Sequence, residues 1–501
     1  MTQPAHWSRH LDAGVDPDSI DLLRRVSLPA AWVANWTREP HRQVLRDVHG
    51  TWSTGADLLA RTTEVAARFA GAGLGRGDRV LLSGRPSTAL VVAHCAAFRL
   101  GLVVVPVNDA YSRRELEVIA DDARPVGAVL ERAEMRKWAT AMGLRVITGV
   151  EVDLPAPGAG APSPTLDDVS SHEPALLPYT SGTTGRPKGA LLSHGNLLAS
   201  AEAILVAWRW TPADRLILCL PLFHMHGLGV GVHGTLLAGA SALLLDRFDA
   251  ELVLSEAADE ATMFFGVPTM YSRLVDAPGA ERMSRLRFCA SGSAPLSPDL
   301  HDRIAARCGQ RIVERYGMTE TVMLTSNPYD GDRRPGSVGI AFPGVDLRLD
   351  PTSSEIEVRG PNVFGGYLDR PEATAESFTT DGWFRTGDIG AVDDDGYVAI
   401  VGRAKELIIS GGYNVYPREV EDLLRAQPGV VDAAVVGAPS PEWGEIVTAF
   451  VEAGPEVDLD AVVAAASAEL APYKRPRAVH RVDALPRNAM GKVVRGELPT
   501  S

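Results

Sequence analysis

Helix-like and strand-like segments alternate along the first quarter of the chain. Apolar residues recur at helical spacing in 56–72 and 88–100, and 112–122 is amphipathic. Between these segments lie two short apolar runs of strand length, 79–83 and 102–107. This alternation is typical of βαβ units, in which helices join parallel strands. We therefore expect an α/β fold built on parallel sheet.

The pattern changes twice further along. A Pro/Gly/Ala-rich stretch at 154–164 has the composition of a linker or surface loop, and α/β alternation then continues to about residue 345. Short strands and turns follow from 355 to 401, and the last hundred residues carry two helical and two strand-like segments. We expect a large N-terminal domain of α/β subdomains plus a short-stranded β region (1–402), and a small C-terminal α+β domain (403–501).

Charge and cysteine content limit the partners. A net charge of -14 over 501 residues argues against nucleic acid or an anionic membrane surface as the main partner. The N-terminus lacks the apolar core of a secretory signal, and the chain has no run of about 18 apolar residues, so no membrane insertion is expected. The four cysteines form no CxxC pair, which favours buried free thiols and a cytoplasmic location.

Lysine is rare in this sequence. Only five of the 49 basic residues are lysine, namely Lys137, Lys188, Lys405, Lys474 and Lys492. Where arginine supplies positive charge almost everywhere, the remaining lysines are enriched at positions that need a compact ammonium group. Three of the five fall in the motifs described next.

The strongest local signal is Tyr179–Gly189, YTSGTTGRPKG, with three glycines, four hydroxyl side chains and Lys188 in eleven residues. Glycines let backbone N–H groups approach an oxyanion, and hydroxyls add donors. The spacing differs from the Walker pattern, which has GxxxxGK followed by Ser or Thr. The segment predicts a phosphate-binding loop of another kind.

This loop resembles the signature of the adenylate-forming superfamily, which includes acyl-CoA synthetases. Four further segments resemble its other landmarks in the same order: YGMTE (316–320), WFRTGD (383–388), GRAKELIISGGY (402–413) and PRNAMGK (486–492). Together they span about residues 175–495. The resemblance implies an AMP-forming acid–CoA ligase that uses ATP, Mg²⁺ and coenzyme A.

The resemblance also implies roles for individual residues. The ATP phosphates would be held by Thr180, Ser181, Gly182, Thr183, Thr184, Gly185 and Lys188, and the adenine enclosed by Ser291, Gly292, Ser293, Ala294, Pro295, Glu314, Arg315, Tyr316 and Gly317. Thr319 would contact the α-phosphate and Glu320 would ligate Mg²⁺, whose preferred ligands are hard oxygens. Asp388 would bind the ribose with Arg403 nearby.

Lys492 is implied to reach both the substrate carboxylate and the α-phosphate. One compact cation between two anions supplies positioning and charge stabilisation together. The C-terminal domain is then implied to rotate about Lys405, replacing Lys492 with the segment Gly411, Gly412 and Tyr413, beside which the thiol arm of coenzyme A would pass. No carrier domain follows Lys492, so free coenzyme A is the expected acceptor. A carrier-protein thiol remains an alternative, and the oligomeric state is not predicted.

The acid is the least constrained part of the prediction. PLFHMHG (221–227) resembles the segment whose histidine borders the acyl and CoA tunnels, with His224 the better match and His226 the weaker. GVPTMYSRL (266–274) and TSNPYDGDR (325–333) resemble malonyl-CoA synthetases, in which case Arg315 would pair with a second carboxylate.

Other residues point to a larger acid. Gly229 and Gly231 suggest a widened acyl pocket, Met323 adds apolar surface, and Gly266 begins a segment beside the pocket. We weigh a bulky, apolar acid slightly ahead of a short dicarboxylate. The segment 344–355 is about a dozen residues shorter than in the family, so an enzyme limited to one half-reaction is a further alternative. A non-catalytic adenylate-binding protein is disfavoured because Lys492 and Glu320 are both present.

Overall fold

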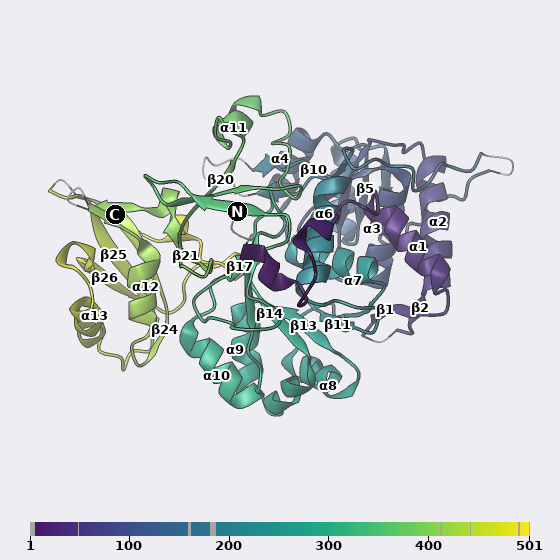
Figure 1. Ribbon diagram of the computed structural model, residues 1–501. Helices are drawn as coiled ribbons and strands as arrows, with labels where there is room; N and C mark the ends of the chain where they lie inside the picture. The colour runs from purple at the N-terminus through teal and green to yellow at the C-terminus, as the bar shows by residue number, and fades with distance from the viewer. Residues whose placement is uncertain are drawn as a thin grey trace.

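The computed structural model describes residues 6–48, 50–158, 162–180, 187–410, 413–440, 442–488 and 491–499 (Figure 1). Most of the chain forms a large α/β body, and the residues after about 400 form a separate lobe at its side. The confirmed fold class is thus α/β with a large N-terminal part and a C-terminal α+β part.

Two sheets form the large body. The first sheet has the strand order β17 (Ile340–Ala341), β16 (Thr325–Ser326), β15 (Val313–Tyr316), β14 (Phe288–Ser291), β13 (Met263–Gly266), β11 (Arg215–Leu218), β12 (Ser241–Leu244), β1 (Gln43–Asp47) and β2 (Ser53–Thr54). The second has the order β10 (Leu192–Ser193), β7 (Pro174–Leu176), β4 (Val103–Pro106), β3 (Arg79–Ser83), β5 (Gly127–Leu130) and β6 (Val146–Thr148). The central strands of both sheets run parallel, as the βαβ pattern predicts.

Helices cover both faces of each sheet. Successive strand residues point to opposite faces, so Val80 and Leu82 of β3 join one core cluster while Leu81 joins another. The second cluster contains residues of α4 (Arg113–Ala123) and α5 (Ala133–Ala141). In the first sheet, Ile217 likewise packs into a cluster with residues of α8 (Ala250–Asp259), α9 (Pro268–Asp276) and α10 (Pro298–Cys308). Burial on both faces explains why the strands are apolar throughout.

A middle layer of helices lies between the two sheets. It consists of α1 (Leu28–Arg38), α2 (Gly55–Gly71), α3 (Thr88–Leu100), α6 (His194–Ala207) and α7 (His233–Ala238), all of which contribute to one large core cluster. All the residues of α3 are buried, since this helix has helices or sheet on every side. Local sequence sets the helix starts: Ser112 caps α4 and Glu115 returns a bond to its backbone.

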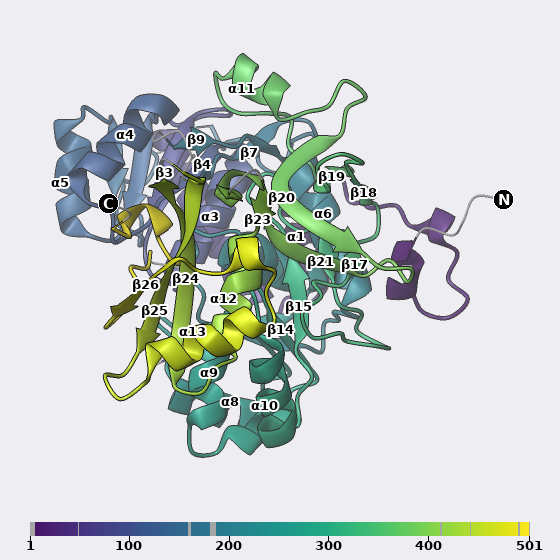
Figure 2. The same cartoon turned by 90° about the vertical axis from the view of Figure 1, so that its left-hand side faces the viewer.

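Two further sheets follow, the first antiparallel and the second antiparallel except for the parallel pair formed by its last two strands in sequence. The first has the order β18 (Asp346–Leu349), β19 (Glu355–Arg359), β20 (Phe384–Val392) and β21 (Val398–Arg403), and a short helix, α11 (Pro371–Glu376), lies between β19 and β20 in sequence. The second contains β22 (Ile408–Ser410), β23 (Tyr413–Val415), β24 (Val430–Ser440), β25 (Gly444–Ala453) and β26 (Ala478–Val482). Figure 2 shows this second sheet beside α12 (Pro417–Arg425) and α13 (Leu459–Ala468).

The observed elements match the sequence expectations closely. The strand predicted at 79–83 and the helix at 88–100 have those bounds, and the turn Asp395-Gly396 joins β20 to β21 as a hairpin. The largest difference concerns the two strand-like segments of the last hundred residues, 431–437 and 448–452, which are parts of two longer strands, β24 and β25. These two strands pair with each other over their whole length, which the apolar pattern alone did not indicate.

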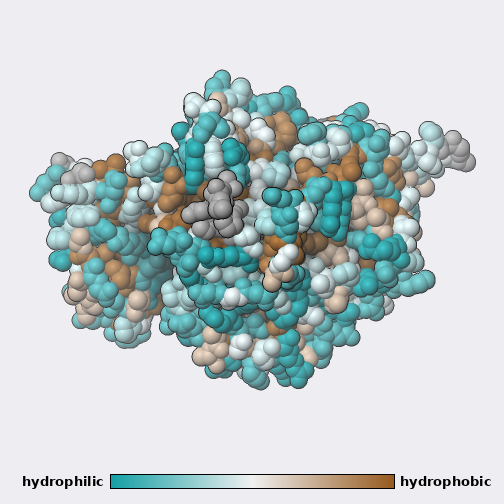
Figure 3. Space-filling model, in the orientation of Figure 1, coloured by the Kyte–Doolittle hydropathy of each residue, from teal (hydrophilic) through white to brown (hydrophobic). Residues whose placement is uncertain are grey.

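The surface and the cysteines agree with the composition. The face in Figure 3 is mainly hydrophilic, with scattered apolar patches. Within the described residues, no helix is long and apolar enough to cross a membrane. Cys95, Cys219, Cys289 and Cys308 are all free and buried, as expected for thiols used as small apolar side chains.

Candidate active site

Neighbouring strands of the first sheet end where the predicted site residues begin. β13 ends at Gly266, β14 at Ser291 and β15 at Tyr316, and these three strands are adjacent and parallel. The chain leaving β11 enters the segment 221–227 at the same edge. Ligand sites in open parallel sheets lie at the carboxyl ends of the strands. The structure therefore gathers motifs that are up to about a hundred residues apart at one sheet edge.

The base of the phosphate loop is a short hairpin that follows β7. β8 (Tyr179–Thr180) pairs with β9 (Lys188–Gly189), placing Thr180 opposite Lys188. The Tyr179 hydroxyl donates a 2.8 Å hydrogen bond to Asp122 of α4, which fixes the hairpin on the large body. Ser181, Gly182, Thr183, Thr184 and Gly185 lie outside the described residues.

Tyr367 connects the phosphate loop to the predicted metal ligand. The Nζ atom of Lys188 lies 5.2 Å from the centroid of the Tyr367 ring. The hydroxyl of Tyr367 donates a 2.9 Å hydrogen bond to Oε1 of Glu320. Sequence reasoning missed Tyr367, because it lies between motifs and only the folded chain brings it against residues 188 and 320.

Glu320 has the properties of a magnesium ligand. It is buried, which raises the pKa of its carboxyl group, while the bond from Tyr367 opposes that rise. Among the described residues, no cluster of three or more His, Cys, Asp or Glu side chains could hold a metal alone. Mg²⁺ usually binds through one or two carboxylates plus substrate phosphates. A single buried glutamate next to a phosphate loop fits that mode.

The turn after β14 provides the predicted adenine-binding segment, Ser291, Gly292, Ser293, Ala294 and Pro295. Ser293 adopts φ = +68°, which is uncommon for a residue with a side chain and occurs often at functional sites. Directly after this turn, the amide of Leu296 donates a 3.1 Å hydrogen bond to Glu314 of β15. Burial raises the pKa of Glu314 to about 7.

The turn after β15 depends on a glycine. A side chain at Gly317 would place its Cβ atom 2.2 Å from the carbonyl oxygen of Val322, so no other residue fits without moving the backbone. Thr319 and Glu320 follow within this tight turn, and the amide of Phe364 donates to the carbonyl of Glu320 at 2.9 Å. The turn thus holds Thr319 and Glu320 in one defined place.

Asp388 lies between Tyr316 and Arg403. Its register partner on β21 is Arg403, whose Nε atom lies 3.1 Å from Oδ1 of Asp388. The Tyr316 hydroxyl donates a 2.5 Å hydrogen bond to Oδ2. Asp388 is buried, and the negative charge of Asp388 raises the pKa of Arg403. A carboxylate oxygen has more than one acceptor position, so ribose hydroxyls can still bind there.

Lys492 reaches this site from the C-terminal lobe. Burial of its ammonium group among protein atoms, with Arg403 and Arg315 nearby, lowers the pKa of Lys492 to about 8, while Asp388 and Glu406 act in the opposite direction. The structure therefore brings Lys492 together with residues of β15, β20 and β21.

His224 and His226 face the same region. Burial, together with the charges of Lys492 and Arg315, lowers the pKa of His224 to about 3, so His224 is neutral. The backbone amide of His226 donates to Nδ1 of His224 at 3.1 Å. Nδ1 of His226 lies 3.4 Å from the Ser293 hydroxyl, while its Nε2 is buried and has no hydrogen-bond partner in the described ranges.

Arg315 is a buried cation with unsatisfied donors. It is 5% exposed, and its Nε and Nη2 atoms have no hydrogen-bond partner among the residues that the structure describes. Burial lowers the pKa of Arg315 to about 9, which still leaves it charged near neutrality. Its guanidinium lies against Gly292, where a Cβ atom would approach its Cζ and Nε to 2.5 Å. A buried, unpaired guanidinium is costly unless an anion binds it.

The two glycines expected to widen the acyl pocket pack closely against neighbouring side chains. A Cβ atom at Gly229 would lie 2.4 Å from Cε of Met225, and one at Gly231 would lie 2.8 Å from Cδ1 of Leu218. Neighbouring side chains already occupy the space that the glycines leave. Both glycines belong to a π-helical segment, His226–Val232, which continues into α7. Their small size serves this packing, and the expectation of an enlarged acyl pocket stays a prediction.

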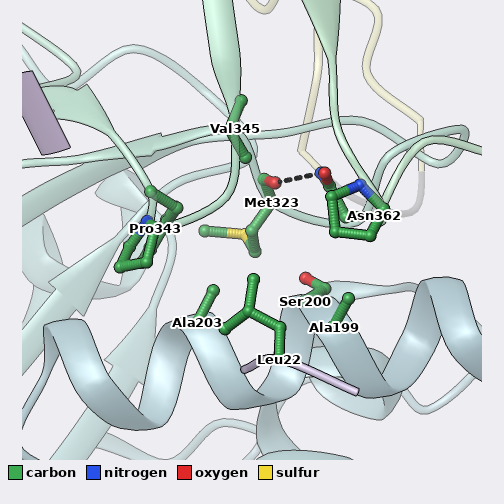
Figure 4. Close-up of a pocket in the computed structure, with 10 residues that line it drawn as sticks. Leu22, Ala199, Ser200, Ala203, Met323, Pro343, Val345 and Asn362 are labelled. Atoms are coloured by element: carbon green, nitrogen blue, oxygen red, sulfur yellow. Dashed lines mark hydrogen bonds between the residues drawn. The ribbon is translucent and has the colours of Figure 1, made fainter. Parts of the chain in front are cut away.

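Met323, which was expected to add apolar surface to the acyl pocket, borders a different cavity in the structure. Its side chain lines a small apolar cavity together with Leu22, Ala199 and Ala203, where it points at α6 (Figure 4). None of Arg315, His224 and His226 lines that cavity. Gly266, in contrast, lies at the end of β13 directly opposite Ser291, at the predicted sheet edge.

The predicted hinge and thiol segment lie in the C-terminal lobe. Lys405 is in a short 3₁₀ turn, Ala404–Glu406, between β21 and β22. Gly411 and Gly412 lie outside the described residues. Tyr413 begins β23 and is largely exposed, with its ring stacked on Tyr473 at 4.7 Å between centroids.

Comparison with known proteins agrees with this geometry. The model of the family described as AMP-binding enzyme matches residues 32–368, and that of the AMP-binding enzyme C-terminal domain matches residues 419–492. A feruloyl-CoA synthase from Amycolatopsis is 38% identical over 480 residues, covering 92% of this chain and 96% of that protein. A sulfoacetate–CoA ligase from Cupriavidus necator is 36% identical, covering 97% and 99%.

A solved structure with bound ATP has the same architecture. The crystal structure of ATP-bound MatB from Rhodopseudomonas palustris superimposes with a TM-score of 0.87 at 41% identity, covering 94% of this chain and 98% of that one. Such agreement over nearly the whole length of each chain confirms both the fold and the class of enzyme. The chain belongs to the AMP-binding enzyme family and is an AMP-forming acid–CoA ligase that uses ATP, Mg²⁺ and coenzyme A.

Proposed function

We propose that this ligase activates a short carboxylic acid that carries a second anionic group, such as malonate or sulfoacetate. The observation that carries the proposal is Arg315, a buried guanidinium whose Nε and Nη2 atoms have no hydrogen-bond partner within the described part of the chain. An anion beside these donors would satisfy them, whereas an apolar acid would leave them unpaired at a cost of about 1–3 kcal/mol or more. The segments resembling malonyl-CoA synthetases support the same choice.

An aryl or other bulky acid is the second candidate. The 38% identity to a feruloyl-CoA synthase favours it. The packing around Gly229 and Gly231 does not add to that support, because Met225 and Leu218 already fill the space beside these glycines. We therefore place the bulky acid behind the short, doubly charged one.

For adenylation, we propose that the phosphate loop with Lys188 holds the phosphates of ATP while Asp388 binds the ribose. A carboxylate oxygen of the acid attacks the α-phosphorus, the bond to the β-phosphate breaks, and pyrophosphate leaves. Lys492, supported by Thr319, lies between the two anions and offsets their repulsion. A cation held in place there both positions the reactants and stabilises the charge of the transition state. Mg²⁺ bound at Glu320 supplies charge neutralisation of the phosphates.

For thiol transfer, we propose that residues 403–501 rotate against 1–402 about Lys405. The thiolate of coenzyme A then attacks the acyl carbonyl, the bond to the phosphate oxygen breaks, and AMP leaves. The segment Gly411, Gly412 and Tyr413 would line the path of the thiol. His224, which is neutral, borders the acid and can act as a hydrogen-bond partner without adding charge.

The acid is tested by a panel assayed for acyl-CoA formation: malonate, sulfoacetate, hexanoate, ferulate and a polycyclic acid. Our proposal expects turnover of malonate or sulfoacetate and a loss of about 10- to 100-fold with Arg315→Gln, as expected for a hydrogen-bonded charge pair. The same variant should change hexanoate turnover much less. Turnover confined to ferulate or larger acids would establish the second candidate instead.

Separate assays test the remaining alternatives. Pyrophosphate exchange measures adenylation, and transfer from a synthetic acyl-adenylate measures the thiol step, so an enzyme limited to one half-reaction would show only one of them. Competition between free coenzyme A and phosphopantetheinyl carrier proteins tests the acceptor, which we propose is coenzyme A. We also propose that the enzyme works in the cytoplasm, where its buried cysteines stay reduced.

A further inference from the structure

The hairpin that carries Lys492 is held on one side by hydrogen bonds of its own. The structure describes 486–488 and 491–494 of this hairpin. The amide of Asn488 donates to the carbonyl of Lys492 at 2.9 Å, and the amide of Lys492 donates to Oδ1 of Asn488 at 3.1 Å. Arg487 donates to the carbonyl of Gly491 at 2.9 Å and pairs with Asp432 of β24. These bonds fix the hairpin on the C-terminal lobe.

Arg495 provides a second attachment, toward the hinge. Its Nη1 atom lies 3.0 Å from Oε2 of Glu406, the residue directly after Lys405. Its Nη2 atom donates a 2.7 Å hydrogen bond to Oε1 of Glu421 on α12. Glu421 is buried and also accepts the amide of Val435 at 2.8 Å. Arg495 therefore joins the end of the Lys492 hairpin to α12 and to the start of the lobe.

Glu406 interacts with charges on both sides of the hinge. Its carboxylate acts electrostatically on Lys492 and on Arg403, and in both cases it favours the protonated form. Arg403 precedes Lys405, whereas Lys492 and Arg495 follow it. The charges of Arg403 and Arg315 lower the pKa of Lys492, and those of Asp388 and Glu406 act against them. Glu406 thus reduces repulsion that would push the ammonium group out of the site.

We propose that Glu406 and Arg495 are positioning residues for adenylation, whose ion pair ties the Lys492 hairpin to the hinge turn and keeps the ammonium facing the nucleotide site. The inference rests on the proposed role of Lys492. Arg487 holds the hairpin on its lobe, and the Glu406–Arg495 pair sets where that hairpin points relative to the hinge turn. Thiol transfer, which does not need Lys492 in the site, should not depend on this pair.

Glu406→Gln is the main test. The Glu406 side chain is 33% exposed, so the fold should tolerate the change, and Glu421 keeps its bonds to Val435 and Arg425 when Glu406 is replaced. Adenylation is followed by pyrophosphate exchange with malonate, or with ferulate if malonate is not turned over. Transfer is followed from the matching synthetic acyl-adenylate. We expect kcat for adenylation to fall about 10-fold, because a small misplacement of a catalytic group lowers the rate. The KM values for ATP and acid should change little.

The pH profile provides a readout that a purely structural role would not move. Removing the charge of Glu406 lowers the pKa of Lys492, so the alkaline limb of adenylation should shift to lower pH. Glu406→Asp should restore most activity, and Arg495→Lys should resemble Glu406→Gln. Glu497→Gln, which removes a carboxylate from the same 3₁₀ turn as Arg495, is the matched control and should be unchanged.

Two results would overturn the inference: an unchanged rate and pH limb in Glu406→Gln, or an equal loss of both half-reactions. Lys492→Ala, assayed alongside, separates this from failure of the proposed site. If Lys492→Ala abolishes adenylation while Glu406→Gln has no effect, only the positioning role is wrong. If Lys492→Ala adenylates normally, the catalytic role of Lys492 is wrong as well.

Discussion

The hydroxyl of Tyr367 donates a 2.9 Å hydrogen bond to Glu320, and the ring of the same tyrosine lies beside the Lys188 ammonium. The bond favours the ionised carboxylate, so it opposes the rise in pKa that burial causes. Tyr367→Phe removes it. Because a hydrogen bond to a charged group contributes about 1.5–3 kcal/mol, adenylation should fall about 10- to 100-fold and need more Mg²⁺.

The direction of the pH effect follows from the same bond. In Tyr367→Phe the pKa of Glu320 rises further, so the acid limb of pyrophosphate exchange should move to higher pH. Tyr397→Phe is a suitable control, since that hydroxyl donates to the carbonyl of Asp332 at 2.6 Å and not to a site residue. Equal Mg²⁺ requirements in Tyr367→Phe and the parent enzyme would contradict the assignment of Glu320.

Lys492→Ala should lose adenylation by at least about 100-fold, as when a group stabilising transition-state charge is removed. Transfer from a supplied acyl-adenylate should persist. With the pKa of Lys492 near 8, adenylation by the parent enzyme should decline as pH rises through that value, because the ammonium loses its charge. Lys474→Ala, which breaks a 2.7 Å ion pair with Glu419 in the same lobe, should leave adenylation nearly unchanged.

Replacing Arg315 with methionine should separate stability from activity. A buried, unpaired guanidinium opposes folding, and an apolar side chain of similar length avoids that cost. We expect Arg315→Met to raise the free energy of unfolding by about 1–3 kcal/mol in urea titrations, while kcat/KM for the preferred acid falls. Arg311→Met, at an exposed position, should change neither. A destabilised Arg315→Met protein would show that Arg315 has a structural partner.

Three buried histidines in the middle layer predict that the folded state loses stability in acid. Nε2 of His94 lies 2.8 Å from Nε2 of His233, and His194 packs nearby against Phe98. Burial lowers the pKa of His94 to about 3, that of His194 to about 4, and that of His233 well below its usual value. Unfolded histidines take up protons near pH 6.5, so stability should fall as pH drops below that value.

The variant His194→Leu tests this linkage. It removes one proton-binding group from the unfolded state, so the loss of stability below pH 6.5 should become shallower by about 1.4 kcal/mol per pH unit. Unfolding free energies from urea titrations at pH 7.0, 6.0 and 5.0 measure it. His172→Gln, at an exposed position, serves as the control. The same slope in His194→Leu and the parent would rule out the explanation.

Local patterns were enough to predict the fold class and much of the secondary structure. β3 and α3 have the predicted bounds because their apolar patterns reflect burial from both sides. The motifs at the ends of β14 and β15 were found because each is a continuous segment whose chemistry is visible in its residues. Their assembly at one sheet edge follows from the parallel topology.

Other features depend on contacts between distant segments and were missed. Tyr367 becomes a site residue only because it lies over Lys188 and against Glu320. Gly229 and Gly231 were taken as signs of free space, whereas Met225 and Leu218 fill that space. Met323 was expected to add apolar surface to the acyl pocket, whereas its side chain points at α6. A sequence shows the size of a residue but not which neighbour uses the room.

The pairing of Asp388 with Arg403 across β20 and β21 has a thermodynamic consequence. Arg403 is two residues before Lys405, so the strand that contacts the ribose site also leads into the C-terminal lobe. If the lobe's orientation alters the Asp388–Arg403 contact, then bound nucleotide must alter the preferred orientation by the same factor, since such coupling is reciprocal. Measured affinities for ATP and AMP would then include the free energy of moving the lobe.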